Sequence, residues 1–143
     1  MSLFNGSFTK TMQMLEKGLD TSMMRRNVLA NNIANVDVPH FKRSDVSFEA
    51  ELKRSVESEK KEKETPKLFT VHREHYDSFQ PREWSKVSAK IHTDYLSSMR
   101  NDGNNVDIED EVTKLTQNQM QYTMYVERLG SQFRLLNNLI RLA

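Results

Sequence analysis

The sequence lacks several features that would point to particular kinds of protein. Its 143 residues contain no cysteine, which excludes a disulfide framework and thiolate chemistry. Four glycines and three prolines are too few for the many tight turns of a compact multi-strand β fold. No run of 18 apolar residues is present, so we expect no membrane-spanning helix. The first residues also lack the basic and then apolar pattern of a Sec-type signal peptide. The chain has 21 basic and 20 acidic residues, and its net charge of +1 is too small to favour binding to nucleic acid or anionic lipid.

What is present is a long periodic segment, Asp107 to Leu142. Apolar residues recur in it with alternating steps of four and three from Ile108 to Ile140, with Gln119 as the one polar member. Such spacing predicts a helix, about 50 Å long, with a left-handed coiled-coil partner. Asp107 is suited to cap its N-terminus, where the helix dipole also favours the acidic residues that follow.

A second long helix is predicted from Ser7 to Asn35. It keeps the same spacing at both ends, while Ser22 and Arg26 interrupt the apolar stripe midway. The helix should end before Pro39, because the residue that precedes a proline is disfavoured in the α region. We interpret this helix as the partner of the C-terminal one, so that the fold class is mainly α.

The middle of the chain differs in composition from both ends. Residues 42–64 carry equal numbers of acidic and basic side chains with a thin apolar stripe, which indicates a marginal, solvated helix. Residues 67–72 and 86–92 read as short strands, and the turn cluster at 101–105 precedes the C-terminal helix. We therefore expect three segments: residues 1–41, an extended or β-containing segment 42–106, and residues 107–143.

Candidate catalytic and metal-binding residues are sparse. His72 and His75 form an H-x-x-H pair, but a zinc site requires a third ligand, for which His92 is available, and Arg73 would oppose a cation. No phosphate-binding loop, nucleophile motif or acidic metal cluster occurs, and Arg25–Arg26 is an isolated basic pair. We expect no enzyme activity, no cofactor, no metal and no nucleic acid partner.

The apolar surface of the two long helices instead favours assembly. The C-terminal stripe alone amounts to about 500 Å², near the upper limit for a monomer, and further apolar side chains widen it toward its end. An amphipathic helix lying on a membrane surface, or a coiled-coil adaptor, is the alternative. The expected assembly interface comprises Phe8, Met12, Leu15, Leu19, Leu29, Ile33, Ile108, Val112, Leu115, Tyr122, Val126, Leu129, Phe133, Leu136, Leu139 and Ile140.

Two short segments resemble a known family. Residues 30–42, Asn-rich and ending in Pro39-His40-Phe41-Lys42, resemble the N-terminal signature of bacterial flagellar rod and hook proteins, and residues 102–109 resemble the C-terminal segment of a proximal rod member. The sister rod protein FlgC typically carries extra residues between the Asn-rich helix end and its aromatic-basic segment. In this chain the Asn-rich end leads directly to Phe41-Lys42. The residues that carry the resemblance are Asn31, Asn32, Asn35, Pro39, Phe41, Lys42, Asp102, Gly103, Asn104, Val106 and Asp107.

The chain departs from the signature at two positions, with Val38 in place of threonine and His40 in place of glycine. If position 40 has a positive φ, a histidine there carries a steric cost. The alternatives are therefore a type I turn or a locally strained loop.

The resemblance implies a structural function. Family members form the hollow, torque-transmitting rod of the flagellar basal body, with paired N- and C-terminal helices at its inner part. We accordingly expect residues 8–35 and 107–142 to form an antiparallel coiled coil. The implied location is the periplasmic rod, reached through the type III export apparatus without a cleaved signal peptide. The implied partners are copies of itself, FlgC and other proximal rod proteins, the basal adapter FliE, the MS ring and the export gate.

Overall fold

The structure, a computed structural model, describes residues 6–64 and 82–142. The chain forms two compact units. Both ends of the chain, up to Val46 and from Ile91 onward, make up the first unit, and residues 47–90 make up the second.

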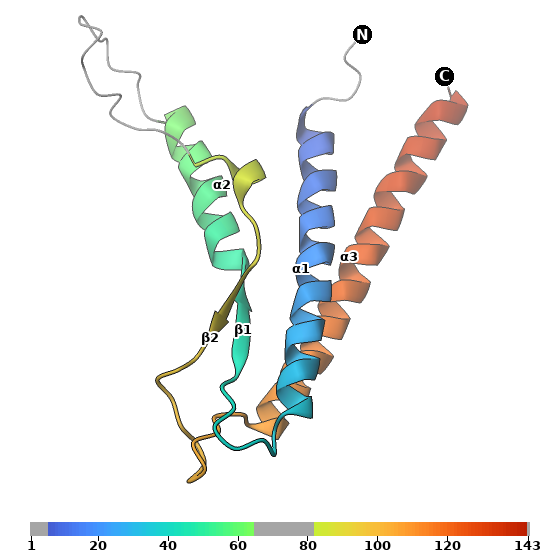
Figure 1. Ribbon diagram of the computed structural model, residues 1–143. Coiled ribbons are helices and arrows are strands. Elements are labelled where there is room, and N and C mark those ends of the chain that lie inside the picture. Colours follow the sequence, from blue (N-terminus) through green and yellow to red (C-terminus); the bar gives the residue numbers. More distant parts are fainter. Residues whose placement is uncertain (1–5, 65–81, 143) are drawn as a thin grey trace, which may run out of the picture. The chain divides into compact units, whose positions relative to one another are not determined.

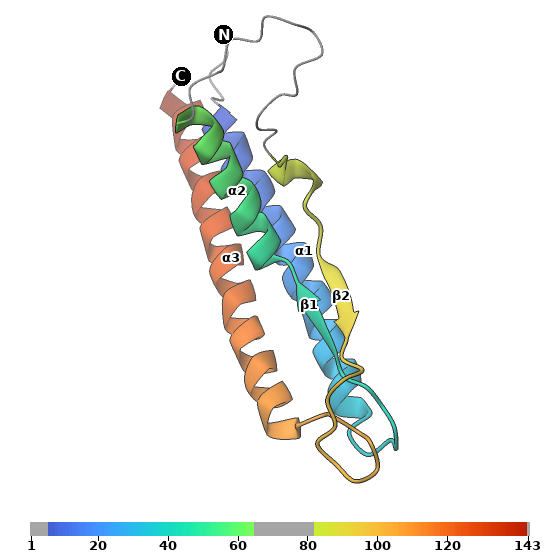
Figure 2. The same cartoon turned by 90° about the vertical axis from the view of Figure 1, so that its left-hand side faces the viewer.

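The first unit is built on two long helices, α1 (Gly6–Ala34) and α3 (Ile108–Leu142). They lie alongside each other and run antiparallel (Figures 1 and 2), since Asn32 near the end of α1 contacts Glu111 near the start of α3, while Gly18 lies against Tyr125. Both predicted helices and their antiparallel pairing are confirmed. The predicted cap is present as well, because Asp107 Oδ1 accepts a hydrogen bond from the Glu109 amide at 3.0 Å.

The side of α3 that faces α1 differs from the predicted stripe. Most of the partly or fully buried positions of α3 form a series at 111, 115, 118, 122, 125, 129, 132 and 136. The predicted stripe shares every second one of these, including Tyr122 and Leu129, whereas its other members lie one position further along the chain. Of these, Val112 is 46% exposed and Phe133 is 52% exposed. The prediction that the whole stripe faces α1 was therefore wrong at every second position.

Polar and small residues explain this rotation. Glu111 and Asn118 are 2% and 4% exposed, and each bonds a group on α1, so the helix can bury them. Opposite them, α1 presents Gly18 and Ser22 at the centre of the contact, and Ser22 is 2% exposed. Small side chains let the two helices approach closely, so Ser22 is part of the contact that it was expected to interrupt.

The connection from α1 passes through a corner to the short strand β1 (Ser44–Ser47), which pairs with β2 (Lys90–Thr93) in a two-stranded sheet. The Ser44 and Thr93 hydroxyls lie 3.0 Å apart across it. The sequence did not predict β1, since its four residues SDVS are mostly polar. The strand predicted at 86–92 is observed at 90–93, since a 3-10 turn, η1 (Trp84–Lys86), includes residue 86, and residues 87–89 lie outside the strand.

The second unit contains α2 (Glu49–Glu64), the predicted charged helix, and η1. Arg82 links the two parts of this unit: its amide donates to Ser58 Oγ at 2.9 Å and its guanidinium pairs with Glu51 at 3.4 Å. The strand predicted at 67–72 lies outside the described residues. Among the described helices, none combines the length and apolarity that crossing a bilayer requires.

Candidate assembly surface

The two segments that resemble the rod and hook family meet at one end of the helix pair. There Asn104, which is fully buried, binds the turn that follows α1. Its Nδ2 donates to the carbonyl oxygens of residues 35, 36 and 38 at 3.2, 3.0 and 2.8 Å, and its Oδ1 accepts from the Val106 amide at 2.8 Å. These three carbonyls belong to the turn that follows α1, so one buried amide satisfies several backbone acceptors of this turn.

A second buried amide joins three segments of the first unit. Asn32 is fully buried; its amide donates to the Ser44 carbonyl at 2.8 Å and accepts from the Ser44 amide at 3.0 Å. The same Nδ2 donates to Glu111 Oε2 at 2.8 Å. The Asn32 amide thus bonds both backbone groups of Ser44, as a neighbouring strand would. Through Asn32, the start of β1 is connected to α1 and, by way of Glu111, to α3.

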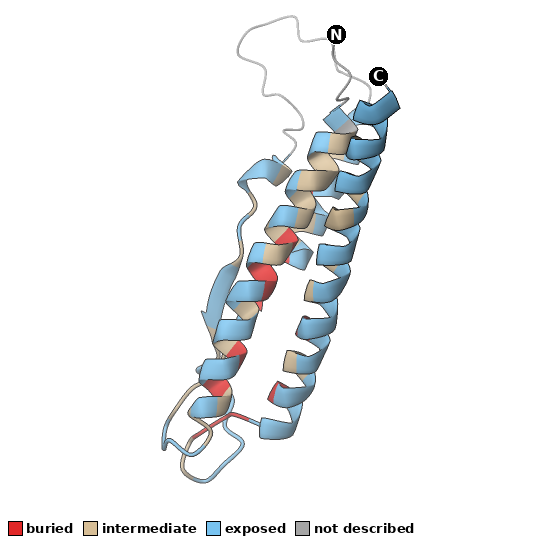
Figure 3. Ribbon diagram, turned by 90° about the vertical axis from the view of Figure 1, so that its right-hand side faces the viewer, coloured by how far each residue is buried: buried red, intermediate tan, exposed pale blue. Residues whose placement is uncertain are grey.

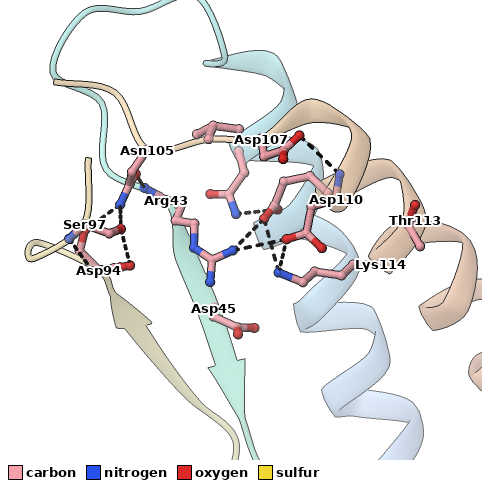
Figure 4. A network of polar contacts seen from close by, with 12 residues as sticks. Arg43, Asp45, Asp94, Ser97, Asn105, Asp107, Asp110, Thr113 and Lys114 are labelled. Atoms are coloured by element: carbon pink, nitrogen blue, oxygen red, sulfur yellow. Dashed lines mark hydrogen bonds and ion pairs between the residues drawn. The ribbon is translucent and has the colours of Figure 1, made fainter. Parts of the chain in front are cut away.

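Charged side chains complete this cluster (Figure 4). The Arg43 guanidinium lies 3.3 Å from the buried Glu111 and 3.6 Å from Asp110, and Lys114 lies 2.6 Å from Asp110. A carboxylate buried as deeply as Glu111 requires such a partner together with the hydrogen bond from Asn32. The hydrogen bond from Lys114 holds the pKa of Asp110 below its usual value.

A third amide, Asn105, holds the loop that follows β2 (Figure 4). Its Oδ1 accepts from the Arg43 amide at 2.7 Å, and its Nδ2 donates to the Asp94 carbonyl at 2.9 Å and to Ser97 Oγ at 3.0 Å. The Ser97 hydroxyl in turn donates to the Asp94 carboxylate at 2.6 Å, and that hydrogen bond lowers the pKa of Asp94. The motif amides are therefore structural at this end, which we call the closed end (residues 31–44 and 94–114).

The corner at His40 takes the strained alternative. His40 has a φ of 61°, in the left-handed region, and its amide donates to the Asp102 carbonyl at 3.1 Å. Gly103 also has a positive φ, and a Cβ there would lie 2.9 Å from the His40 ring. Lys42 fixes the same corner by donating to the carbonyls of Ser97 and Gly103, both at 2.9 Å.

Along the rest of the helix pair, the apolar members of the predicted stripes that do not face the partner helix lie on a common side. On each helix these positions repeat every seven residues, and each except Ile140 directly follows a partly or fully buried position. In an antiparallel pair, the positions of α1 and those of α3 then lie at matching heights on the same side. Midway along the pair, Arg26 of α1 and Gln119 of α3 line the same hollow of about 110 Å³. We call this side the open flank. It comprises the apolar residues Met12, Leu19 and Ile33 of α1 and Val112, Val126, Phe133 and Ile140 of α3, together with the polar residues Arg26 and Gln119 midway.

The α3 side of the open flank is largely exposed (Figure 3). Val126, Phe133 and Ile140 are 45%, 52% and 68% exposed, and Leu139, further along the helix, is 57% exposed. Of the remaining expected interface residues, Ile108 is 47% exposed, whereas the others, such as Leu29, are partly or fully buried. The expected set thus divides between the helix contact and an uncovered surface.

Sequence reasoning missed the buried polar positions. Glu111 and Asn118 are spaced by seven residues on the buried side of α3, and this repeat was the available signal. In the described part of the chain, no three His, Cys, Asp or Glu side chains are placed to hold a metal ion. His72 and His75, the histidine pair weighed as zinc ligands, lie outside that part.

Comparison with known proteins gives consistent matches. Residues 12–42 match the family described as "Flagella basal body rod protein". The flagellar basal body rod protein FlgB of Borrelia hermsii is 37% identical over 134 residues, which cover 94% of this chain and 98% of that protein. FlgB of Bacillus subtilis is 36% identical, covering 98% of this chain and 97% of its own. FlgB of Escherichia coli is 26% identical, covering 88% of this chain and 89% of its own.

Proposed function

The chain belongs to the family of flagellar basal body rod proteins FlgB, and from this premise we propose that its open flank carries the contacts by which it assembles. It is a structural subunit of the flagellar basal body rod and not an enzyme. Its function requires neighbours, because a rod is formed only by contacts between subunits.

One observation carries the proposal. The open flank and the C-terminal turns of α3 expose large apolar side chains, among them Phe133 and Ile140, along a helix whose buried side is already occupied by α1. Isolated exposed apolar residues are ordinary, but a continuous row of them along a helix indicates a surface that a partner covers.

We propose copies of the chain itself, FlgC and other proximal rod proteins as neighbours. At the base of the rod, we propose the adapter FliE, the MS ring and the export gate. The rod would lie in the periplasm, reached through the flagellar export apparatus without a cleaved signal peptide. These assignments are supported by the resemblance of residues 30–42 and 102–109 to rod proteins. The membrane-surface and adaptor alternatives gain no support from the family assignment.

The test is a charge on the open flank. In a flagellated strain that lacks its own copy of this protein, Phe133→Asp should abolish incorporation into isolated basal bodies and motility, because a carboxylate would be buried without a partner. Since Phe133 is half exposed, the helical content of the free chain should change little. Gln117→Asp, which places the same charge at an exposed position of α3 outside the open flank, is the control and should assemble. Normal motility of the Phe133 variant would contradict the proposal.

A further inference from the structure

The middle of the open flank contains an unsatisfied buried acceptor. Asn118 is 4% exposed, and its Nδ2 donates to the Ser22 carbonyl at 2.9 Å. This bond fixes the orientation of the amide, and the buried Oδ1 has no hydrogen-bond partner among the described residues. Asn118 lines the hollow of about 110 Å³ together with Arg26 and Gln119. A buried acceptor without a donor costs free energy, so a group that supplies the donor would be bound favourably there.

The surroundings define the chemistry of that group. Asn118 Oδ1 needs a hydrogen-bond donor, while the guanidinium of Arg26, which lines the same hollow, has only donors and needs an acceptor. A carboxamide offers both on separate atoms, an NH₂ group as the donor and a carbonyl oxygen as the acceptor. The hollow therefore fits the amide of a glutamine or asparagine that enters from outside.

The flank on either side of the hollow is apolar. One heptad toward the closed end it presents Ile33 and Val112, and one heptad in the other direction it presents Leu19 and Val126. A helix that covers the flank must therefore carry an amide between apolar residues at seven-residue spacing.

The described part of this chain contains such a stripe on α3, where Gln119 stands between Val112 and Val126, and all three are exposed. We propose that α3 of a second copy of this chain packs on the open flank, so that its Gln119 donates to Asn118 Oδ1 and accepts from Arg26. This inference rests on the proposed function, because it names the occupant of the same surface.

This polar contact, between Gln119 of one copy and Asn118 and Arg26 of the other, would fix the axial register of the two copies. A shift of one heptad would place Gln119 against Val112 or Val126 and leave its amide buried without a partner, whereas the matching register satisfies Asn118. A single polar residue in an apolar helix contact sets register in this way in coiled coils.

The test uses disulfide formation between two copies, which is clean because the chain has no cysteine of its own. Two differently tagged versions, Arg26→Cys and Gln119→Cys, are expressed together in the deletion strain, and isolated basal bodies are oxidised. Each version carries one thiol, so a mixed dimer reports contact between copies. It forms only where the two Cα atoms approach within about 7 Å. The control pair is Arg26→Cys with Gln117→Cys, an exposed glutamine on α3 outside the flank.

A mixed dimer from the 26 and 119 pair, with loss of that product for the 26 and 117 pair, is the expected result. Equal products from both pairs, or no 26–119 product in basal bodies that contain both versions, would overturn this inference and leave the proposed function intact. If the unmodified chain were absent from basal bodies, the proposed function would fail and this inference with it.

Discussion

The closed end and the open flank are built from opposite kinds of side chain. At the closed end, Asn32, Asn104 and Glu111 are almost completely buried, and each makes hydrogen bonds to more than one segment. On the open flank, Val126 and Phe133 are apolar and about half exposed. The usual arrangement of apolar interior and polar surface is thus partly reversed within one helix pair.

This difference separates two tasks. Buried amides have directional requirements, so a satisfied set of them admits one arrangement of α1, β1 and α3. Apolar contact is non-directional and proportional to area, and it suits a surface that gains its stability only when another subunit covers it. The closed end therefore determines the fold of the subunit, and the open flank is left for assembly.

The largest expected effect on the free chain comes from the closed end. Asn104→Ala removes the donor for three carbonyl groups of the turn that follows α1 and the acceptor for the Val106 amide. Leaving these groups buried and unpaired should lower the free energy of unfolding by about 2–3 kcal/mol. Urea denaturation followed by circular dichroism measures this loss. Asn101→Ala, at an exposed turn position, should change it by less than about 0.5 kcal/mol. Equal effects of the two would show that the buried amide does not determine the corner.

Two glycines, one at the contact between α1 and α3 and one at a position of α3 with open space around it, test how closely the helices approach. A Cβ on Gly18 would lie 3.2 Å from ring carbons of Tyr125, whereas a Cβ on Gly130 would meet nothing within 4 Å. Gly18→Leu should destabilise the chain by about 1 kcal/mol, because overpacking exceeds the gain in helix propensity. Gly130→Ala should instead stabilise it by up to about 1 kcal/mol. The midpoints of urea denaturation check both signs, and stabilisation by Gly18→Leu would mean that α1 and α3 are not in close contact there.

Periodicity predicted the helices but not the facing of their sides. The 4-3 spacing and the Asp107 cap located α1 and α3 closely, because these are local signals. The stripe of α3 was too wide for one partner, so hydrophobicity alone could not select its inner edge. Glu111 and Asn118, whose partners come from distant parts of the chain, selected it.

The closed end could be predicted in part. The motif residues identified the family and the corner, and the cost of a positive φ at His40 was anticipated as one of two alternatives. The strand β1 could not be predicted, because its pairing groups are a side-chain amide, Asn32, and a strand more than 40 residues later. Neither contact leaves a local signal in the four residues of β1.

The corner itself can be relaxed. His40→Gly removes the steric conflict between a Cβ and a φ of 61°, and should raise the free energy of unfolding by up to about 1 kcal/mol. His40→Asn should give a smaller gain, because asparagine tolerates the left-handed region better than histidine does. Thermal denaturation orders the three chains. If His40→Gly were destabilising, the His40 side chain would be contributing more than its backbone strain costs.

The smallest effect concerns the charged rim of the closed end. Hydrogen bonding by Lys114 lowers the pKa of Asp110 below 3.8, so the folded state holds this carboxylate ionised more readily than the unfolded state does. Its contribution is therefore fully present above the unfolded pKa and is lost as the pH falls below 3.8 through the lowered folded value. Because Asp110 is largely exposed, Asp110→Asn should cost only about 0.2–0.5 kcal/mol at neutral pH. The difference between the two chains should vanish in acid urea denaturation. A difference that persisted below that window would mean that Asp110 stabilises the closed end by something other than its charge.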